Sequence, residues 1–252
     1  MIDEGKTKSK VNRLIVFDVE GVLVPKRRYL LFEAARKGDF WDFIKITMIG
    51  VLYEIGLLPL ESALKRIFKM LKGLTADEIF QLYKKIPLMP GAKEVFERLN
   101  TAGHKTALIS SGLPTLIVED LATRLKADYA FGLELEIVDG HLTGGIGGDV
   151  LKAGGKAIVL KRILEKEGLS SSDCVVVADD RNNLSMFSLC TLKIGCNPDF
   201  LLTAKSDFVI KDDFSDILPI ITEGIPQVSN PPLSRSERFR ETIHMGNFLL
   251  PF

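Results

Sequence analysis

The stretch "RLIVFDVEGVLVP" (residues 13–25) decides the fold, because a short apolar run passes directly into two acidic residues and a glycine. The run "LIVF" has the length and composition of a buried strand. Asp18 and Glu20 follow it, and Val19 between them is expected to pack inward. Carboxylates brought together at the end of a buried strand are costly unless a cation neutralises them. This stretch therefore predicts a strand that ends in a functional site.

The composition narrows the class of protein. The chain has 252 residues, 46% of them hydrophobic, which is enough for one large core or for a core with a small second domain. Basic and acidic residues number 33 each, so we expect no net positive electrostatic potential of the kind that binds nucleic acid. The three cysteines form no CxxC pair, and the first ten residues are polar rather than those of a signal peptide. These features predict a cytoplasmic protein with free thiols and no nucleic-acid partner.

One segment is nearly apolar enough to span a membrane. Residues 43–60, "FIKITMIGVLYEIGLLPL", approach the roughly 20 residues that a spanning helix needs. However, Lys45 and Glu54 lie inside it, and a central charge costs roughly 2.5–3.5 kcal/mol on insertion scales. We therefore expect no membrane span but a buried helix pair broken near Gly56 and Pro59. Contact with a membrane surface or a partner is the alternative.

Between residues 90 and 222 helical and strand patterns alternate. The predicted strands are "HKTALIS", a hairpin "LELEIVDGHLTG" around Asp139-Gly140, "DCVVVADD", "TLKIGC" and "DFVI". Strands that alternate with helices of 10 to 15 residues indicate right-handed crossovers and a mainly parallel sheet covered on both faces. The fold class is therefore α/β, with a doubly wound, Rossmann-like parallel sheet.

The remaining segments are expected to lie outside this sheet. Residues 26–88 are rich in helix formers and read as a small helical cap inserted after the first strand, with Trp41 in its core. The predicted domains are a core of residues 11–25 and 89–223, the cap, and a C-terminal tail of residues 224–252. The glycine-rich "GGIGG" (144–148) is interpreted as a flexible loop rather than a dinucleotide fingerprint.

Polar side chains gather where the predicted strands end. In an open parallel sheet, sites form at the carboxyl ends of the strands. Carboxylates there suit a hard cation, Mg²⁺ above all, while a lysine, a serine hydroxyl and loop amides suit a phosphoryl group. The residues in question are Asp18, Glu20, Ser110, Ser111, Asp179, Asp180 and, opening a helix, Lys156.

Four motifs in this order resemble the haloacid dehalogenase superfamily. They are "FDVEGVLVP", "LISSG", "GGDVLKAGGKAIVL" and "VVVADDRNNLSMF", and within the superfamily they look most like the phosphoserine phosphatase subgroup. The DxE variant of the first motif is similar to a branch with phosphoserine:homoserine phosphotransferase activity. The resemblance runs from residue 13 to about 222 and implies a cap that closes over the substrate.

The resemblance implies a role for each acidic residue of the site. Asp18 is the nucleophile that forms an aspartyl-phosphate. Glu20 protonates the leaving oxygen and then activates water. Mg²⁺ is held by Asp18, by the backbone carbonyl of Glu20 and by Asp179, with Asn183 in the metal loop.

The resemblance also implies the groups that bind substrate. Ser110 and Lys156 bind phosphoryl oxygens, as does the amide of Ser111, and these contacts offset developing charge. Asn182 lies in the metal loop beside Asn183. Arg27 falls where the family recognises the part of the substrate other than the phosphoryl group. The implied partner is a small-molecule phosphomonoester, and a homodimer is left open.

Two departures from the family concern the catalytic groups. Glu20 replaces the usual second aspartate, and a misplacement of about 1 Å can cost on the order of 10²-fold in rate. Asn183 replaces a carboxylate, which should weaken Mg²⁺ binding about 10- to 100-fold as changes around metal ligands do. Asp180, at a position where the family has glycine, is a candidate to compensate.

A third departure concerns the substrate pocket. Arg27 and Ile67 fall where phosphoserine phosphatases have an acidic residue and a cap arginine, and Arg66 would point about 100° away on a helix. A more anionic or more apolar phosphomonoester is therefore expected to suit the pocket better than phosphoserine.

Together these patterns predict a Mg²⁺-dependent phosphomonoester hydrolase that acts through an aspartyl-phosphate. Phosphotransfer to an alcohol acceptor is one alternative, because it needs the same residues. A catalytically weak member that acts as a binding or scaffold protein is the other. A dehalogenase is disfavoured by Glu20, since that chemistry uses the nucleophile without an acid two residues on.

Overall fold

The computed structural model describes residues 12–25, 40–84, 86–211 and 213–222. Its strands are β1 (Leu14–Phe17), β2 (Lys105–Pro114), β3 (Tyr129–Val138), β4 (His141–Gly147), β5 (Cys174–Ala178), β6 (Leu192–Cys196) and β7 (Phe208–Ile210). Its α-helices are α2 (Phe40–Glu54), α3 (Leu60–Met70), α4 (Ala76–Lys84), α5 (Ala92–Thr101), α6 (Thr115–Leu125), α7 (Gly155–Glu167), α8 (Leu184–Phe187), α9 (Phe200–Thr203) and α10 (Ile217–Thr222).

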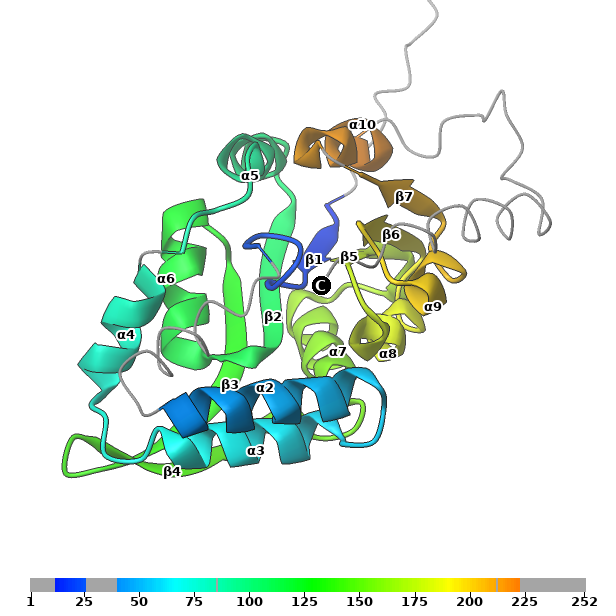
Figure 1. The fold of residues 1–252 in the computed structure, drawn as a ribbon. Coiled ribbons are helices and arrows are strands. Elements are labelled where there is room, and N and C mark those ends of the chain that lie inside the picture. The colour runs from blue at the N-terminus through cyan, green and yellow to red at the C-terminus, as the bar shows by residue number, and fades with distance from the viewer. Residues whose placement is uncertain (1–11, 26–39, 85, 212, 223–252) are drawn as a thin grey trace, which may run out of the picture.

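The strands form one sheet in the order β4-β3-β2-β1-β5-β6-β7, in which β4 alone runs antiparallel. The first strand lies in the middle, and Phe17 pairs with Leu108 of β2 on one side and with Val177 of β5 on the other (Figure 1). The chain winds outward in one direction to β3 and β4, then returns to β5 and winds the other way. The carboxyl end of β1 is therefore the topological switch point, where ligands bind in open α/β sheets.

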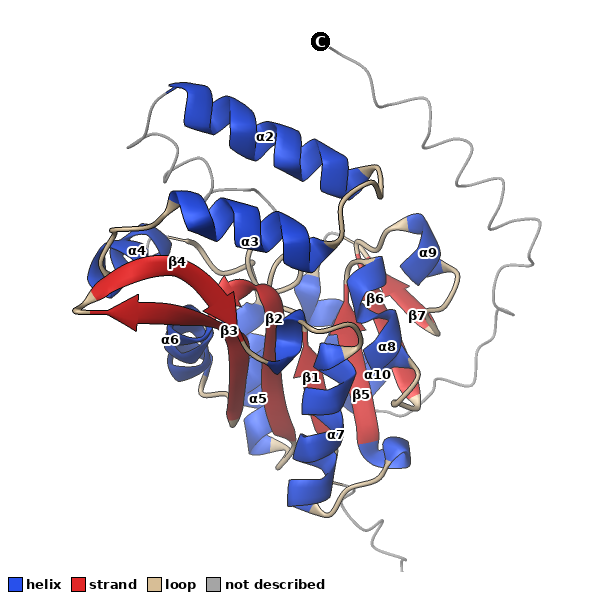
Figure 2. Ribbon diagram, turned by 90° about the horizontal axis from the view of Figure 1, so that it is seen from below, coloured by secondary structure: helices blue, strands red, loops and turns tan. Residues whose placement is uncertain are grey.

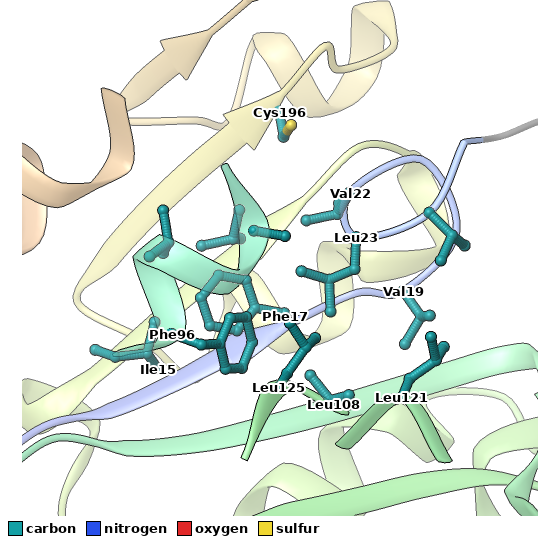
Figure 3. Packing of buried hydrophobic residues seen from close by; sticks show 14 of the residues in the cluster. Ile15, Phe17, Val19, Val22, Leu23, Phe96, Leu108, Leu121, Leu125 and Cys196 are labelled. Atoms are coloured by element: carbon teal, nitrogen blue, oxygen red, sulfur yellow. The ribbon is translucent and has the colours of Figure 1, made fainter. Parts of the chain in front are cut away.

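Alternate residues of the central strands pack on opposite faces of the sheet. Ile15 and Phe17 belong to the core under α5, α6 and α10, and the ring of Phe17 lies 4.7 Å from that of Phe96 (Figure 3). Leu14 and Val16 belong to the second core, under α7 and α8. Both faces are covered, which confirms the doubly wound α/β prediction. Val19 is fully buried, as expected.

The structure corrects two of the predicted boundaries. The strand expected to end at Ser110 continues to Pro114, with a register shift between Ile109 and Pro114, because Pro114 still pairs with Leu133. The predicted flexible loop of residues 144–148 is wrong over most of its length, since Gly144 lies inside β4 and packs against α3. A Cβ on Gly144 would stand 2.9 Å from Lys69 Cα, which explains the glycine there.

The hairpin predicted around Asp139-Gly140 is confirmed. It joins β3 to β4, and both turn residues have positive φ, 50° and 77°, as a two-residue hairpin loop requires. In Figure 2 this hairpin lies below α3, and α2 lies outermost, above α3.

The chain leaves and re-enters the core at one place after β1. The amide of Met89 donates to the carbonyl of Leu23 at 2.8 Å, so α2, α3 and α4 lie on an excursion between neighbouring points. This arrangement supports the predicted cap, although the domain boundaries themselves stay predictions. Arg27 lies outside the described residues.

The predicted helix pair exists, but it is buried on one side only. Ile46 and Ile49 of α2 are buried, whereas Met48 is 59% exposed and Trp41 is 68% exposed. The expectation that Trp41 lies in the cap core is therefore wrong. Because α2 is apolar all round, its sequence pattern does not distinguish the buried face from the exposed one. Among the described helices, none is both long and apolar enough to cross a membrane.

All three cysteines are free, as predicted, and all three are buried. Burial raises the pKa of each thiol, to about 12 for Cys190 and Cys196. Buried thiols of this kind are unreactive. The cytoplasmic location stays a prediction.

Candidate active site

Asp18 follows β1 directly and is held on both carboxylate oxygens. Its amide extends the ladder to Val177 of β5, 2.9 Å away. Oδ1 accepts from the amide of Val19 at 2.7 Å and lies 2.9 Å from Nζ of Lys156. Oδ2 accepts from Nδ2 of Asn183 at 2.5 Å. The carboxylate is buried, so these contacts both compensate its charge and fix its orientation.

Lys156 reaches this carboxylate from the first turn of α7. Its side chain is buried, and Nζ also donates to Oδ1 of Asn183 at 2.8 Å. The preceding Gly155 allows the start of α7 to lie close to the backbone of Asp149, since a Cβ on Gly155 would stand 1.8 Å from the carbonyl oxygen of Asp149. Three residues far apart in the chain thus form a closed triangle of Asp18, Lys156 and Asn183.

The end of β5 brings further acidic groups to the same point. One carboxylate oxygen each of Asp18, Asp179 and Asp180 lies within 4.8 Å of the others. Gly21 makes this approach feasible, because its φ is +83° and a Cβ on it would stand 2.0 Å from Oδ2 of Asp179. A set of hard oxygen donors, of which Asp18 and Asp179 are buried, fits Mg²⁺.

Asn183 has a different environment from the one expected of a metal ligand. Its amide oxygen accepts from Lys156, while its amide nitrogen donates to Asp18 and, at 3.2 Å, to the carbonyl oxygen of Asp180. The residue is fully buried and bridges the nucleophile candidate to the lysine. Its predicted part in holding metal stays a prediction.

The two serines of β2 use their hydroxyls differently. Ser110 Oγ accepts from the amides of Gly112 (3.2 Å) and Leu113 (3.0 Å), which leaves its hydroxyl hydrogen to donate elsewhere. Ser111 Oγ donates to the carbonyl of Val150 at 3.0 Å. The hydroxyl of Ser110 is therefore the better placed for a phosphoryl oxygen, and the part assigned to the Ser111 amide stays a prediction.

The carboxylate of Glu20 lies against the end of β2. A Cβ on Gly112 would stand 2.2 Å from Oε2 of Glu20. Glu20 also acts on Tyr83 of α4, whose pKa is raised well above its usual value by burial and then by the negative charge of Glu20. Neither Gly112 nor Tyr83 was predicted as a site residue. A glycine after two serines is typical of any loop, and a tyrosine in an amphipathic helix is typical of a core.

Helix α2 contacts the loop after β5 through Tyr53. The Tyr53 hydroxyl accepts from Nδ2 of Asn182, which also donates to Oδ2 of Asp180 at 3.2 Å. Arg181 donates to the carbonyl oxygen of Tyr53 at 3.3 Å, and its guanidinium lies 5.9 Å from the centroid of the tyrosine ring. Asn182, predicted to bind substrate, is thus engaged with the cap helix. The sequence pattern carries no signal for Tyr53.

The predicted pocket differences can be placed only in part. Ile67 is buried against Ile49 and Ala63, in the contact between α2 and α3. Arg66 beside it is exposed and does not share the buried surroundings of Ile67.

Comparison with known proteins shows the family to which the chain belongs. A family model described as haloacid dehalogenase-like hydrolase matches residues 15–188. A phosphoserine phosphatase of Archaeoglobus fulgidus is 36% identical over 80% of this chain, and the chain spans 57% of that relative's length. A phosphoserine phosphatase of Methanocaldococcus jannaschii is 32% identical over 84% of this chain and 99% of its own.

Two solved structures are similar over the same range. One is described as a phospho-aspartyl intermediate analogue of phosphoserine phosphatase, with a TM-score of 0.74, 32% identity, and coverage of 84% of this chain and 99% of that one. The other is a substrate-bound phosphoserine phosphatase complex, with a TM-score of 0.75, 31% identity and the same coverage.

Proposed function

Because the chain belongs to the haloacid dehalogenase-like hydrolase family, in its phosphoserine phosphatase-like branch, we propose that it hydrolyses a phosphomonoester through an aspartyl-phosphate on Asp18, with Mg²⁺ as cofactor. One observation carries the proposal. The Asp18 carboxylate lies 2.9 Å from the buried ammonium of Lys156 and in one cluster with Asp179, at the switch point of the sheet.

The first step forms the phosphoenzyme. A carboxylate oxygen of Asp18 attacks phosphorus as the bond from phosphorus to the ester oxygen breaks. The departing oxygen takes a proton from Glu20 and leaves as an alcohol. Lys156 and the hydroxyl of Ser110 bind the phosphoryl oxygens and offset the charge that develops on them.

The second step releases phosphate. Glu20, now ionised, takes a proton from water, whose oxygen attacks phosphorus while the bond to Asp18 breaks. The products are inorganic phosphate and the original carboxylate, and Glu20 is protonated again. Asn183 holds Asp18 in place through both steps by its 2.5 Å hydrogen bond.

The residues that would hold Mg²⁺ are Asp18, Asp179 and the backbone carbonyl of Glu20, with Asp180 beside them. When bound, the ion would supply positive charge that offsets the negative charge of the phosphoryl group. The fold itself holds the carboxylate oxygens of Asp18, Asp179 and Asp180 within 4.8 Å of one another.

We propose that the substrate is a phosphomonoester more anionic or more apolar than phosphoserine. Ile67 falls where the resemblance implies a cap arginine, and its side chain is buried among uncharged neighbours. Among the described residues, the side chains packed around Ile67 are uncharged, so none of them offers a cation to a carboxylate on the substrate. The relatives named as phosphoserine phosphatases give the reaction class but not this preference.

The test compares the parent protein with Asp18→Asn on para-nitrophenyl phosphate with Mg²⁺. The variant keeps the size of the side chain but removes the nucleophile, and kcat is expected to fall by about 10³-fold or more. Mg²⁺ with beryllium fluoride should raise the melting temperature of the parent and not of the variant. Turnover that survives in Asp18→Asn would refute the aspartyl-phosphate.

A panel of phosphomonoesters tests the substrate class. Phosphoserine is compared with sugar, nucleotide and lipid phosphates, and a clear preference for phosphoserine would overturn the proposed class. The panel is repeated with an added alcohol acceptor, because phosphorylated acceptor would indicate transfer in place of hydrolysis. A complete absence of turnover would favour the scaffold alternative.

A further inference from the structure

Gly112 faces the carboxylate of Glu20 at a distance that leaves no room for a side chain unless the end of the Glu20 side chain moves. An ideal Cβ on Gly112 would stand 2.2 Å from Oε2, 3.3 Å from Cδ and 3.7 Å from Oε1 of Glu20. Real Cβ atoms essentially never approach an oxygen as closely as the first of these distances. The two residues therefore share one volume, which Glu20 occupies.

The backbone at Gly112 gives no other reason for a glycine. Gly112 belongs to β2 and is not among the glycines with positive φ, in contrast to Gly21 at +83°. An alanine at position 112 would thus cause no backbone strain. Its methyl group would instead contact the carboxylate of Glu20.

The contact matters because glutamate is one methylene longer than the aspartate usual at this position of the family. A longer acid must fold back or be given space if its proton is to reach the same ester oxygen. Errors of about 1 Å in the position of a catalytic group can cost on the order of 10²-fold in rate.

We propose that Gly112 is a positioning residue: by lacking a side chain it makes the space in which the longer acid Glu20 is held for proton transfer. The inference rests on the proposed function, since it assigns Glu20 the part of acid and base.

A four-variant cycle tests the coupling between the two positions. It compares the parent, Gly112→Ala, Glu20→Asp and the double variant, each on para-nitrophenyl phosphate and on a simple alkyl phosphate with Mg²⁺. The alkoxide leaving group needs a proton far more than the nitrophenolate does. We expect Gly112→Ala to lower kcat about 10- to 100-fold on the alkyl phosphate and only a few-fold on the aryl phosphate.

In the Glu20→Asp background the same alanine should change kcat by less than about 3-fold, because the shorter acid leaves room for the methyl group. Gly147→Ala is the matched control. Gly147 also lies in a strand without positive φ, and a Cβ there would meet nothing within 4 Å. Its kcat on both substrates should equal that of the parent.

Two results would overturn the inference. One is an equal loss on both substrates that persists in the Glu20→Asp background, which would mean that alanine disturbs Ser110 through the amide of Gly112. The other is no loss at all. A crystal structure of Gly112→Ala decides the matter without turnover, since a displaced Glu20 carboxylate in an unchanged β2 supports the inference and an unmoved one refutes it. If the parent itself shows no Asp18-dependent turnover, the proposed function fails, while the crystal structure still tests the contact.

Discussion

Two regions of the molecule, the site at the end of β1 and the cap helix α2, are stabilised by different kinds of interaction. At the site, Asp18, Lys156 and Asn183 are buried, and each contacts the other two at 2.9 Å or less. On α2, Met48 is 59% exposed while its neighbour Ile49 is buried. The first region depends on paired charges that tolerate no missing member. The second depends on apolar packing on one side, so the effect of a substitution there should depend on the face it occupies.

The largest effect is expected from Lys156→Met, which removes the cation from the buried pair. Asp18 then keeps a buried negative charge with only hydrogen bonds to offset it, and breaking such a pair typically costs about 3–5 kcal/mol. The free energy of unfolding, measured by urea denaturation without Mg²⁺, should fall by this amount. Loss of a cation from the phosphoryl site should also lower kcat on the order of 10²–10³-fold.

Lys161→Met is the matched control on the same helix. Lys161 is 70% exposed and lies 3.9 Å from Glu165, which is also exposed. Pairs of this kind contribute about 0–1 kcal/mol, so stability and kcat should stay close to those of the parent. Equal destabilisation by the two substitutions would mean that the Lys156–Asp18 pair carries no special weight.

The next effect separates the two faces of α2. Ile49→Ala removes a buried side chain from the contact with Ala63 and Ile67 and should cost about 2 kcal/mol or more. Met48→Ala, one residue earlier and mostly exposed, should change the free energy of unfolding by less than about 0.5 kcal/mol. Urea denaturation of the two variants makes the comparison. Similar losses for both would mean that the exposed face is covered in solution, which a second copy of the chain in a homodimer would explain.

The site was more predictable from sequence than the cap, for a physical reason. Strand periodicity and the rule that parallel strands end at one edge bring Asp18, Ser110 and Asp179 together without any knowledge of side-chain packing. The contacts of Tyr53 and Gly112 depend on how an inserted segment and a shifted strand lie in space, which no periodicity encodes. Helix α2 makes this plain, because a helix that is apolar all round gives no sign of its buried face.

The extent of β2 shows a second limit. The residues "SSGLP" are typical of a loop, yet the strand continues through them because β3 still offers a partner to Pro114. Local composition predicted that Ser110 lies near the end of a strand. It did not predict that the strand continues past Ser110, with the backbone of Gly112 against the Glu20 carboxylate.

A smaller effect is expected from Asn183→Asp, which restores the acidic residue typical of the family. Without metal, a carboxylate would replace the amide that donates to Asp18 at 2.5 Å, so a hydrogen bond becomes a contact of like charges. The free energy of unfolding in EDTA should fall by about 1–3 kcal/mol. With metal, the added charge should lower the Mg²⁺ concentration for half-maximal activity about 10-fold.

Both halves of that prediction are needed. A variant that is less stable in EDTA and binds Mg²⁺ no more tightly would mean that Asn183 acts only as a bridge between Lys156 and Asp18. A variant of unchanged stability would contradict the direct contact with Asp18.

The smallest effect is expected where the two regions meet, at Tyr53→Phe. The change removes the hydroxyl that accepts from Asn182 and leaves the ring beside Arg181. A neutral hydrogen bond is worth about 1 kcal/mol, which corresponds to roughly a 5-fold change in an equilibrium constant. If this contact holds the cap over bound substrate, KM should rise about 5-fold while kcat stays within about 2-fold, because no reacting group is altered. Tyr129→Phe is the control, since the Tyr129 hydroxyl is also part of one side-chain hydrogen bond, here as the donor to Glu167, and this bond raises its pKa to about 12. That bond involves neither the cap helices nor Asp18, so the KM of Tyr129→Phe should match that of the parent.

A fall in kcat with unchanged KM in Tyr53→Phe would instead mean that Tyr53 helps to position Asp180 and Asn183. The cap helix would then affect the catalytic step rather than substrate binding.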